Sequence, residues 1–239
     1  MYLYIIRHGH PVYSPVEMLT EEGHKQARAL APRLVQSGIT RIYSSPLRRA
    51  IETAQPTADA LGLPINIEPW TSEDVAWSRF HVEYPDGRQR WIFEVDDTAS
   101  FMRGKNHDAL DKWYEIEPMK YVVNAKEGYE QLMAESDEFL ARHGYERDGN
   151  EYIVRRHNDE RIAVFCHEGF SLGWLSHLLR IPPNIYWCQF KMTHTGVTIL
   201  RFVDTDNGRT VPKVMGMSDM SHIYADTETP YLFNTRWKV

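Results

Sequence analysis

Histidines and arginines stand where apolar runs end, at two places far apart in the chain. "YIIRHGHPV" brings Arg7 and His8 after an apolar run near the start, and "RIAVFCH" ends on His167 in the last third. Arg48 and Arg49 follow "SSPL", a pattern typical of a helix start. A guanidinium binds phosphate through a planar fork of N–H donors, and a neutral imidazole can attack phosphorus. Together these side chains would form a site for a phosphoryl group.

The elements of the first third predict how the side chains are brought together. Strands are expected at 2–7, 39–45 and 65–70, and helices at 19–38 and 45–64. This β-α-β-α-β alternation predicts an α/β/α three-layer sandwich with a mostly parallel central sheet. The carboxyl ends of parallel strands share one edge, where ligands bind beside helix N-termini. His8 and His167 are both expected there.

Capping residues mark the ends of the two helices. Thr20 is the expected N-cap of the first helix, and Gly38 ends it. Ser45 is the expected N-cap of the second helix, with Pro46 at its first position and Pro56 as the site of a kink. Arg49 then lies in a first turn, where the helix dipole disfavours cations and a bound anion would offset that cost.

The rest of the chain continues the pattern around one irregular segment. Helices are expected at 125–144 and 170–180, and strands at 161–167, 196–203 and 210–217, with "YIVRR" as a further pairing segment. Between the first third and the helix expected at 125–144, the chain is rich in aromatic and charged residues and shows no clear periodicity.

We expect this segment, 77–125, to be an insertion over the carboxyl edge of the sheet. Its aromatic side chains would serve packing first and form a wall against the substrate second. No composition shift divides the chain, so residues 1–239 are predicted to form a single domain.

Composition narrows the classes of function. A net charge of −6 over 239 residues argues against nucleic acid as a partner unless a local basic patch exists. No stretch approaches the roughly 20 apolar residues of a membrane span, so a soluble, cytoplasmic protein with no membrane partner is expected. Two cysteines, Cys166 and Cys188, are too few for a disulfide framework and suit a reducing compartment. The oligomeric state stays open, a homodimer being one possibility.

Five blocks in this order resemble the histidine phosphatase, or phosphoglycerate mutase-like, superfamily. They are "RHG" after the first strand, "LTEEGHKQA" and "SSPLRRAIETA" on the two helices, an acidic residue after the third strand, and "FCHEG" late in the chain. The resemblance covers about the first 75 residues and then about residues 125–200. "RHG" alone is a weak motif, whereas five blocks on the right elements are specific together.

The resemblance implies a role for each candidate residue. His8 resembles the nucleophile that becomes a phosphohistidine, and Arg7 and Arg49 resemble the arginines that hold the phosphate. His167 resembles the second histidine on the phosphoryl oxygens, and Glu73 resembles the general acid. The implied activity is metal-independent hydrolysis of a small-molecule phosphomonoester, with no cofactor.

Two of these assignments have a neighbour as rival. Arg48 could face the site while Arg49 pairs with Glu52, because Glu52 lies within one helical turn of both. The family pattern favours Arg49, which directly precedes an alanine. Asp74 is likewise adjacent to Glu73, and spacing does not choose between the two carboxyls.

Other readings of the site remain open. His8, His10 and His167 could be metal ligands, although the arginines beside them would repel a divalent cation. The protein could be a mutase that returns the phosphoryl group to a second hydroxyl, or a weakly active phosphate-binding or regulatory protein. Glu168 stands where many relatives have glycine, which brings a carboxylate near the phosphate site unless its side chain turns away.

Overall fold

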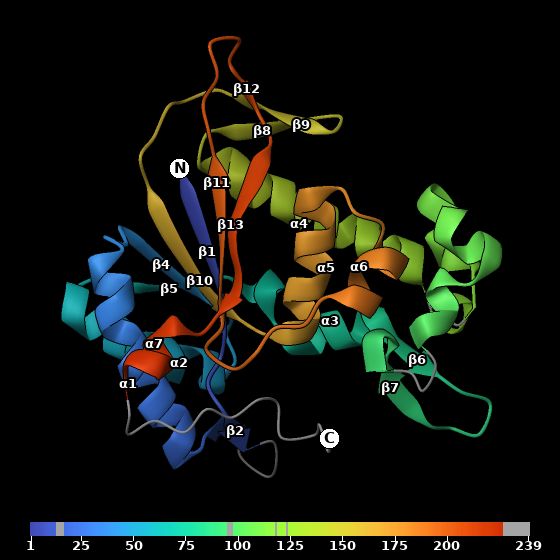
Figure 1. Cartoon of the computed structure of the whole chain (residues 1–239), viewed down its shortest axis with the longest axis horizontal. Coiled ribbons are helices and arrows are strands. Elements are labelled where there is room, and N and C mark those ends of the chain that lie inside the picture. The colour runs from blue at the N-terminus through green and yellow to red at the C-terminus, as the bar shows by residue number, and fades with distance from the viewer. Residues whose placement is uncertain (13–16, 95–97, 118, 123, 227–239) are drawn as a thin grey trace.

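A six-stranded sheet forms the centre of the molecule (Figure 1). The computed structural model describes residues 1–12, 17–94, 98–117, 119–122 and 124–226. The strands lie in the order β13-β11-β1-β10-β4-β5, with bounds β1 Tyr2–Arg7, β4 Arg41–Ser44, β5 Ile65–Ile67, β10 Arg161–Cys166, β11 Val197–Phe202 and β13 Pro212–Asp219. β1, β10, β4 and β5 are mutually parallel, while β11 and β13 run antiparallel to their neighbours. The predicted mostly parallel sheet is confirmed.

Helices cover both faces of the sheet, as the three-layer prediction requires. Figure 1 shows α1 (Glu21–Gln36), α2 (Arg48–Leu61) and α7 (Ser221–Ala225) on one side. The other side carries α3 (Glu73–Phe80), α4 (Ala125–Arg142), α5 (Glu168–Leu179) and α6 (Pro183–Gln189). That the whole of residues 1–239 forms one domain stays a prediction.

The alternation of side chains along β1 explains why this strand is apolar throughout. Leu3 and Ile5 pack in a core with α4 and α5, whereas Tyr4 and Ile6 pack in a second core with α1 and α2. Successive side chains of a strand point to opposite faces, so a central strand between two helix layers must be apolar at every position. The run therefore places Arg7 and His8 at the first point where the strand leaves the core.

Thr20 caps α1 as predicted, since its side chain accepts a hydrogen bond from the N–H of Gly23. The predicted cap of the second helix is wrong. α2 starts at Arg48 with Leu47 as its N-cap, so Pro46 lies before the helix rather than at its first position. The hydroxyl of Ser45 contacts His167 instead, and α2 runs on through Pro56.

The predicted strand at 65–70 is shorter than expected. β5 ends at Ile67, and a 3₁₀ turn, η1 (Pro69–Thr71), leads into α3, which the sequence patterns did not reveal. The side chain of Ser72 caps α3 by accepting from the N–H of Asp74. Helix α6 is also unpredicted, because only seven residues form it.

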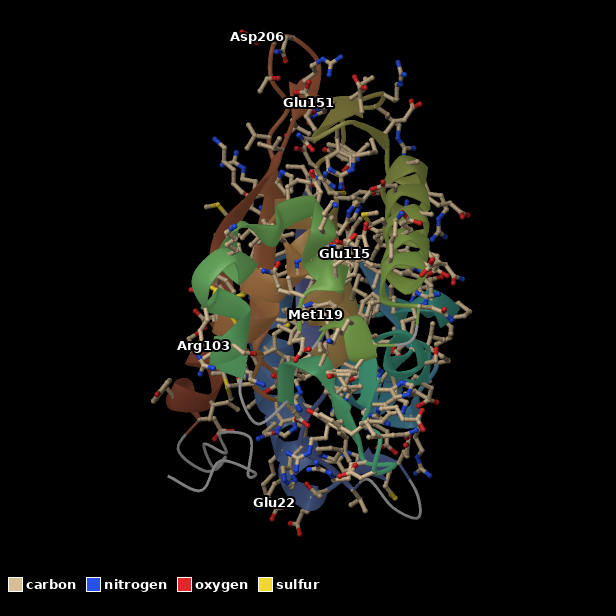
Figure 2. All side chains as sticks on the ribbon, turned by 90° about the vertical axis from the view of Figure 1, so that its right-hand side faces the viewer. Glu22, Arg103, Glu115, Met119, Glu151 and Asp206 are labelled. Atoms are coloured by element: carbon tan, nitrogen blue, oxygen red, sulfur yellow. The ribbon has the colours of Figure 1, made fainter. Side chains whose placement is uncertain are left out.

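The segment predicted as an insertion has two parts. Its first part contains β6 (His81–Glu83), β7 (Gln89–Trp91) and η2 (Ile92–Glu94), and its second part contains η3 (Thr98–Met102), η4 (Gly104–Glu115) and η5 (Met119–Tyr121). Trp113, Met119 and Val122 belong to the larger core, so the second part packs on the helices of that side. Figure 2 shows this part across the front of the molecule, marked by Arg103, Glu115 and Met119. Residues 95–97, 118 and 123 of the segment lie outside the described residues.

Small hairpins complete the fold. β8 (Tyr145–Asp148), β9 (Glu151–Val154) and β12 (Arg209–Thr210) form a sheet at the amino ends of the parallel strands, which gives "YIVRR" its pairing partners (Figure 1). β2 (Pro11–Val12) pairs with β3 (Met18–Leu19) at the opposite end. Within the described ranges, no helix has the length and apolar character to cross a membrane.

Candidate active site

Neighbouring strand ends bring the two predicted histidines together. In the β1–β10 pairing Arg7 lies opposite Cys166, and the backbone N–H of His8 donates to the carbonyl of Cys166 at 2.9 Å. The next strand, β4, adds Ser45, whose N–H donates to the carbonyl of Phe165 at 2.9 Å. The carboxyl edge of the parallel sheet thus presents these residues side by side.

The imidazole of His8 is held in one tautomer. Its side chain is buried, and Nδ1 lies 2.7 Å from the carbonyl oxygen of Gly9. A carbonyl oxygen can only accept, so Nδ1 carries the proton and Nε2 keeps its lone pair. The geometry leaves Nε2 available as a nucleophile.

His167 lies beside His8, with their ring centroids 5.1 Å apart. Its Nε2 is 2.7 Å from the hydroxyl oxygen of Ser45, and its Nδ1 has no hydrogen-bond partner within the described part of the chain. His167 is also the N-cap residue of α5, whose first N–H groups point out of the helix at this end. The unpartnered Nδ1 of His167 is thus available to an anion bound between the rings.

Both histidines are neutral in this environment. Burial lowers the pKa of His8 well below its ordinary value, and the charges of His167, Arg7 and Arg49 lower it further. Burial also lowers the pKa of His167, with smaller contributions from Arg49 and Arg7. A neutral His8 is the form that can attack phosphorus.

The two neighbouring arginines of α2 have different surroundings. Arg49 is 3% exposed, and its Nη1 lies 2.5 Å from Oε2 of Glu17. Arg48 is exposed, and its Nε donates to Oε1 of Glu52 at 2.6 Å. Arg49 is therefore the arginine that faces the histidines. Arg48 forms the ion pair with Glu52, which the sequence alone could assign to either arginine.

Arg7 is buried together with Glu168. Its Nη1 lies 3.0 Å from Oε2 of Glu168 and donates to the carbonyl of Met192 at 2.6 Å. The carboxylate of Glu168 also accepts from the N–H of Met192 at 3.3 Å. Glu168, which stands where many relatives have glycine, thus neutralises the charge of Arg7, one of the two buried arginines.

Glu73 lies directly at the start of α5. Its Oε1 accepts from the N–H of Gly169 at 3.0 Å, and its Oε2 accepts from the N–H of Phe170 at 2.9 Å. Asp74, by contrast, is exposed. Of the two adjacent carboxyls, Glu73 is the one close to the histidines.

The pKa of Glu73 is raised to about 7. Burial is the largest cause, and it outweighs the hydrogen bonds from Phe170 and Gly169 and the charges of Arg49 and Arg7, which lower the pKa. A bound phosphate dianion would raise the pKa further, since like charges disfavour each other. The carboxyl can therefore carry a proton near neutral pH, as general acid catalysis requires.

Trp91 closes the site on the side of Glu73. A Cβ placed at Gly169 would lie 2.7 Å from Cη2 of Trp91 and 3.0 Å from Oε1 of Glu73, so only glycine permits both approaches. Trp77 packs edge-on against Trp91 at 4.8 Å between ring centroids. Two aromatic rings of the segment predicted as an insertion thus lie beside Glu73, and their role as a wall against the substrate stays a prediction.

The sequence reasoning missed His194 among the residues that line the site. Its ring centroid is 5.7 Å from that of His8 and 5.4 Å from that of His10. The sequence did contain a signal, because His194 lies two residues before the strand predicted at 196–203. An antiparallel strand starts at the edge where its parallel neighbours end, and β11 is antiparallel to β1.

Metal ligation was one reading of the histidines. In the residues that the structure describes, no three His, Cys, Asp or Glu side chains are arranged to hold a metal ion.

Comparison with known proteins places this fold and site in a family. Residues 3–86 and 95–213 match the histidine phosphatase superfamily (branch 1). The chain belongs to this superfamily, which confirms the resemblance drawn from the five blocks.

Two curated relatives match part of the chain. Phosphoserine phosphatase 1 of Hydrogenobacter thermophilus is 35% identical over an alignment of 107 residues, and the match covers 38% of this chain and 51% of that protein. A probable phosphoglycerate mutase, GpmB, of Yersinia pestis is 36% identical over an alignment of 139 residues, and the match covers 48% of this chain and 63% of that protein. The chain thus aligns with about half to two thirds of the length of these relatives.

Solved structures share the fold over nearly the whole chain. Phosphoserine phosphatase from Entamoeba histolytica, in complex with 3-phosphoglyceric acid, superposes with a TM-score of 0.61 at 18% identity, covering 93% of this chain and 98% of that one. Mycobacterial glucosyl-3-phosphoglycerate phosphatase, in complex with VO3, gives a TM-score of 0.56 at 19% identity, covering 91% and 98%.

Proposed function

We propose that the protein is a metal-independent phosphomonoester hydrolase that acts through a phosphohistidine on His8. The observation that carries this proposal is the position of Glu73, a carboxyl with a pKa of about 7 that contacts the same helix end on which His167 lies. A nucleophile with a fixed lone pair, two buried arginines and a protonatable carboxyl are the groups that phosphoryl transfer needs.

In the first step, Nε2 of His8 attacks phosphorus in line with the ester oxygen. The N–P bond forms as the P–O ester bond breaks, and the electron pair of that bond goes to the leaving oxygen. Glu73 gives its proton to this oxygen, and the alcohol departs. Arg7, Arg49 and His167 bind the equatorial phosphoryl oxygens, where charge is spread in the transition state.

In the second step, water attacks the phosphohistidine. The carboxylate of Glu73 takes a proton from this water as the new P–O bond forms and the N–P bond breaks. The electron pair returns to Nε2 of His8, and inorganic phosphate is released. The gain and loss of one proton by Glu73 balance over the cycle.

The proposed substrate class is a small-molecule phosphomonoester. The names of the relatives support it, since a phosphoserine phosphatase and a glucosyl-3-phosphoglycerate phosphatase both act on phosphate esters of small hydroxy acids or their derivatives. The aromatic wall of Trp91 and Trp77 stands where the leaving group would lie, and it is expected to choose among such esters.

The test is hydrolysis of p-nitrophenyl phosphate and of an alkyl phosphate by the wild-type protein and by His8→Ala. We expect turnover that persists in EDTA, inhibition by vanadate, and no turnover or acid-labile phosphate labelling in His8→Ala. Turnover that EDTA abolishes and a divalent metal restores would favour a metal enzyme. Appreciable turnover by His8→Ala would show that another group is the nucleophile.

The mutase alternative is separated by product analysis. A probable phosphoglycerate mutase is among the relatives, and a mutase uses the same phosphohistidine. With a phosphorylated hydroxy acid as substrate, a phosphatase releases inorganic phosphate, whereas a mutase returns an isomeric phosphomonoester. Binding of phosphate with no turnover of any ester would favour a phosphate-binding or regulatory protein.

A further inference from the structure

His194 is a buried imidazole without a hydrogen-bond partner. Its side chain is 2% exposed, and neither ring nitrogen has a partner among the residues that the structure describes. The ring lies beside the rings of His8 and His10, at centroid distances of 5.7 and 5.4 Å. Buried polar groups in folded proteins are nearly always paired, so an unpaired ring beside a nucleophile needs an explanation.

The backbone after His194 is strained. Thr195 has a φ of +55°, a left-handed conformation that β-branched residues rarely adopt. Its N–H donates to the carbonyls of Arg7 at 3.0 Å and His8 at 3.3 Å, and its hydroxyl donates to the carbonyl of His194 at 2.7 Å. Strain of this kind costs on the order of 1 to 3 kcal/mol and is characteristic of functional sites.

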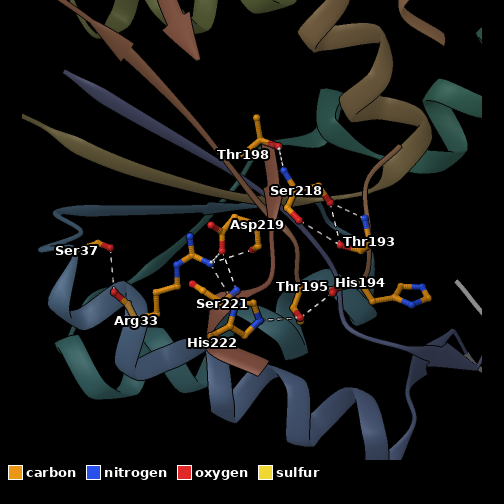
Figure 3. Close-up of polar contacts among 10 residues, drawn as sticks. All are labelled: Arg33, Ser37, Thr193, His194, Thr195, Thr198, Ser218, Asp219, Ser221 and His222. Atoms are coloured by element: carbon orange, nitrogen blue, oxygen red, sulfur yellow. Dashed lines mark hydrogen bonds and ion pairs between the residues drawn. The ribbon is translucent and has the colours of Figure 1, made fainter. Parts of the chain in front are cut away.

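Hydrogen bonds from neighbouring segments fix the loop of residues 193–195. The hydroxyl of Thr195 lies 3.0 Å from Nε2 of His222, and the N–H of Thr193 donates to the hydroxyl of Ser218 at 2.8 Å. Arg33 of α1 forms an ion pair of 2.8 Å with Asp219, the residue that follows Ser218. Figure 3 shows that the ring of His194 points away from this hydrogen-bonded cluster. The loop is fixed, and the ring is left for another partner.

The charge state of the ring suits a hydrogen-bond donor. Burial lowers the pKa of His194 far below its ordinary value, and Arg7, His8 and His10 lower it further. The ring is therefore neutral, with one N–H and one lone pair. A neutral N–H close to Arg7 and His8 can donate to the anionic oxygens of a phosphoryl group bound there.

We propose that His194 is a further substrate-binding residue, whose ring N–H donates a hydrogen bond to an oxygen of the phosphoryl group on His8. The proposal rests on the proposed function, since it assumes that His8 receives the phosphoryl group. It adds a third histidine to the phosphate site, supplied by a strained loop rather than by a parallel strand end.

The variants His194→Phe and His194→Asn test the proposal. Phenylalanine fills the space without a donor, whereas asparagine keeps one. We expect His194→Phe to lower kcat/KM about 10- to 100-fold, the range for a hydrogen bond to a charged group, and by the same factor for an aryl and an alkyl phosphate. Vanadate inhibition should weaken by a similar factor, and His194→Asn should lie between the wild type and His194→Phe.

A matched control is His177→Phe. His177 is equally buried, but its Nε2 lies 2.9 Å from Asp137, away from the site. This variant should lower Tm and leave the vanadate inhibition constant unchanged. Vanadate inhibition of His194→Phe equal to that of the wild type would overturn the proposal. A loss restricted to one leaving group, with unchanged vanadate inhibition, would also overturn it and assign His194 to the leaving group.

A measurement on the wild-type protein does not depend on whether the variants fold. In ¹⁵N NMR spectra of the imidazoles, with signals assigned by ring connectivity in the wild type, vanadate should shift the ring signals of His194. The absence of a shift under saturating vanadate would overturn the proposal. If the wild type hydrolyses no phosphomonoester, the proposed function fails, while this vanadate titration still decides the role of His194.

Discussion

Glu17 places a carboxylate oxygen 2.5 Å from Nη1 of Arg49. The Arg49 side chain is buried, whereas that of Glu17 is 45% exposed. A carboxylate and a phosphate use the same fork of guanidinium donors, so Glu17 must leave or share Arg49 when phosphate binds. We therefore expect Glu17 to compete with a bound phosphate group for Arg49.

Glu17→Gln removes this competitor. We expect the inhibition constant of inorganic phosphate and the KM for p-nitrophenyl phosphate to fall about 2- to 5-fold, because half-exposed ion pairs are weak. Glu21→Gln is the matched control, since Glu21 is an exposed carboxylate of α1 that pairs only loosely with Lys25 at 3.8 Å. An unchanged phosphate constant in Glu17→Gln would show that Glu17 does not compete.

Replacing Glu73 should affect poor leaving groups most. A nitrophenolate departs unaided, whereas an alkoxide needs a proton in the transition state. Glu73→Gln should therefore lower kcat/KM about 10²-fold or more for an alkyl phosphate and far less for an aryl phosphate. The measurement is the ratio of the two specificity constants.

Asp74→Asn is the control for this prediction, because its side chain is exposed next to Glu73. It should change neither constant. If Asp74→Asn shows the leaving-group dependence and Glu73→Gln does not, the general acid is the neighbouring residue. If neither shows it, the proton comes from another group, and Glu168 is the next carboxyl to replace.

The raised pKa of Glu73 also predicts a cost in stability. Its pKa is 4.5 in the unfolded chain and about 7 in the folded protein, so the folded state binds the proton more tightly. The free energy of unfolding therefore falls as pH rises from 4.5 to 7, and the loss is complete above pH 7. The amide of Glu73→Gln does not titrate, so this variant does not undergo that loss in the free energy of unfolding.

Denaturant unfolding at pH 5 and pH 8 measures this effect. The stability of Glu73→Gln relative to the wild type should increase between the two pH values, by on the order of 1 to 3 kcal/mol. If the free energy of unfolding of Glu73→Gln relative to the wild type is the same at pH 5 and pH 8, the carboxyl has an ordinary pKa in the folded state.

Trp91→Ala should alter substrate choice more than folding. The ring is partly buried and lies over Gly169 beside Glu73, so its loss opens the side of the site where a leaving group would lie. We expect the ratio of kcat/KM between bulky and small phosphomonoesters to change severalfold, and Trp77→Ala to act in the same direction through Trp91.

Trp113→Ala is the matched control for the aromatic wall. Trp113 is 6% exposed and belongs to the core, where loss of a large aromatic side chain costs about 3 to 5 kcal/mol. It should lower Tm with little change in the ratio between substrates. If Trp91→Ala lowers kcat/KM equally for all substrates and also lowers Tm, Trp91 serves packing rather than substrate choice.

The sequence was sufficient to predict a mostly parallel sheet and the residues at the ends of its two central strands, β1 and β10. An apolar run followed by Arg7 and His8, and another followed by His167, fixes both the strands and the edge at which they end. The helices α1 and α2 were predicted from capping and stop residues, of which the Thr20 cap is confirmed and the Ser45 cap is wrong.

Features that depend on contacts between distant segments were less predictable. Ser45 has the sequence character of an N-cap, but in the fold its hydroxyl contacts His167, and α2 begins three residues later. Local patterns do not contain that partner. The choice of Glu73 over Asp74 likewise depends on which carboxyl reaches the start of α5.

His194 escaped prediction because its neighbours are distant in sequence. Its backbone is held by Thr195, whose partners are the carbonyls of Arg7 and His8. The role of Glu168 was also undecidable from the sequence, since a carboxylate in that position could face either way. The structure shows it paired with Arg7.

The central position of β1 has a consequence for how the chain folds. β1 is synthesised well before its sheet partners, because β10 and β11 lie in residues 161–166 and 197–202. Long-range pairing of this kind is slow, and an apolar strand awaiting its partners is prone to aggregate. We therefore expect truncated chains that end before residue 161 to need chaperones or to precipitate. The candidate site at the end of β1 is therefore complete only after the last third of the chain has paired with this strand.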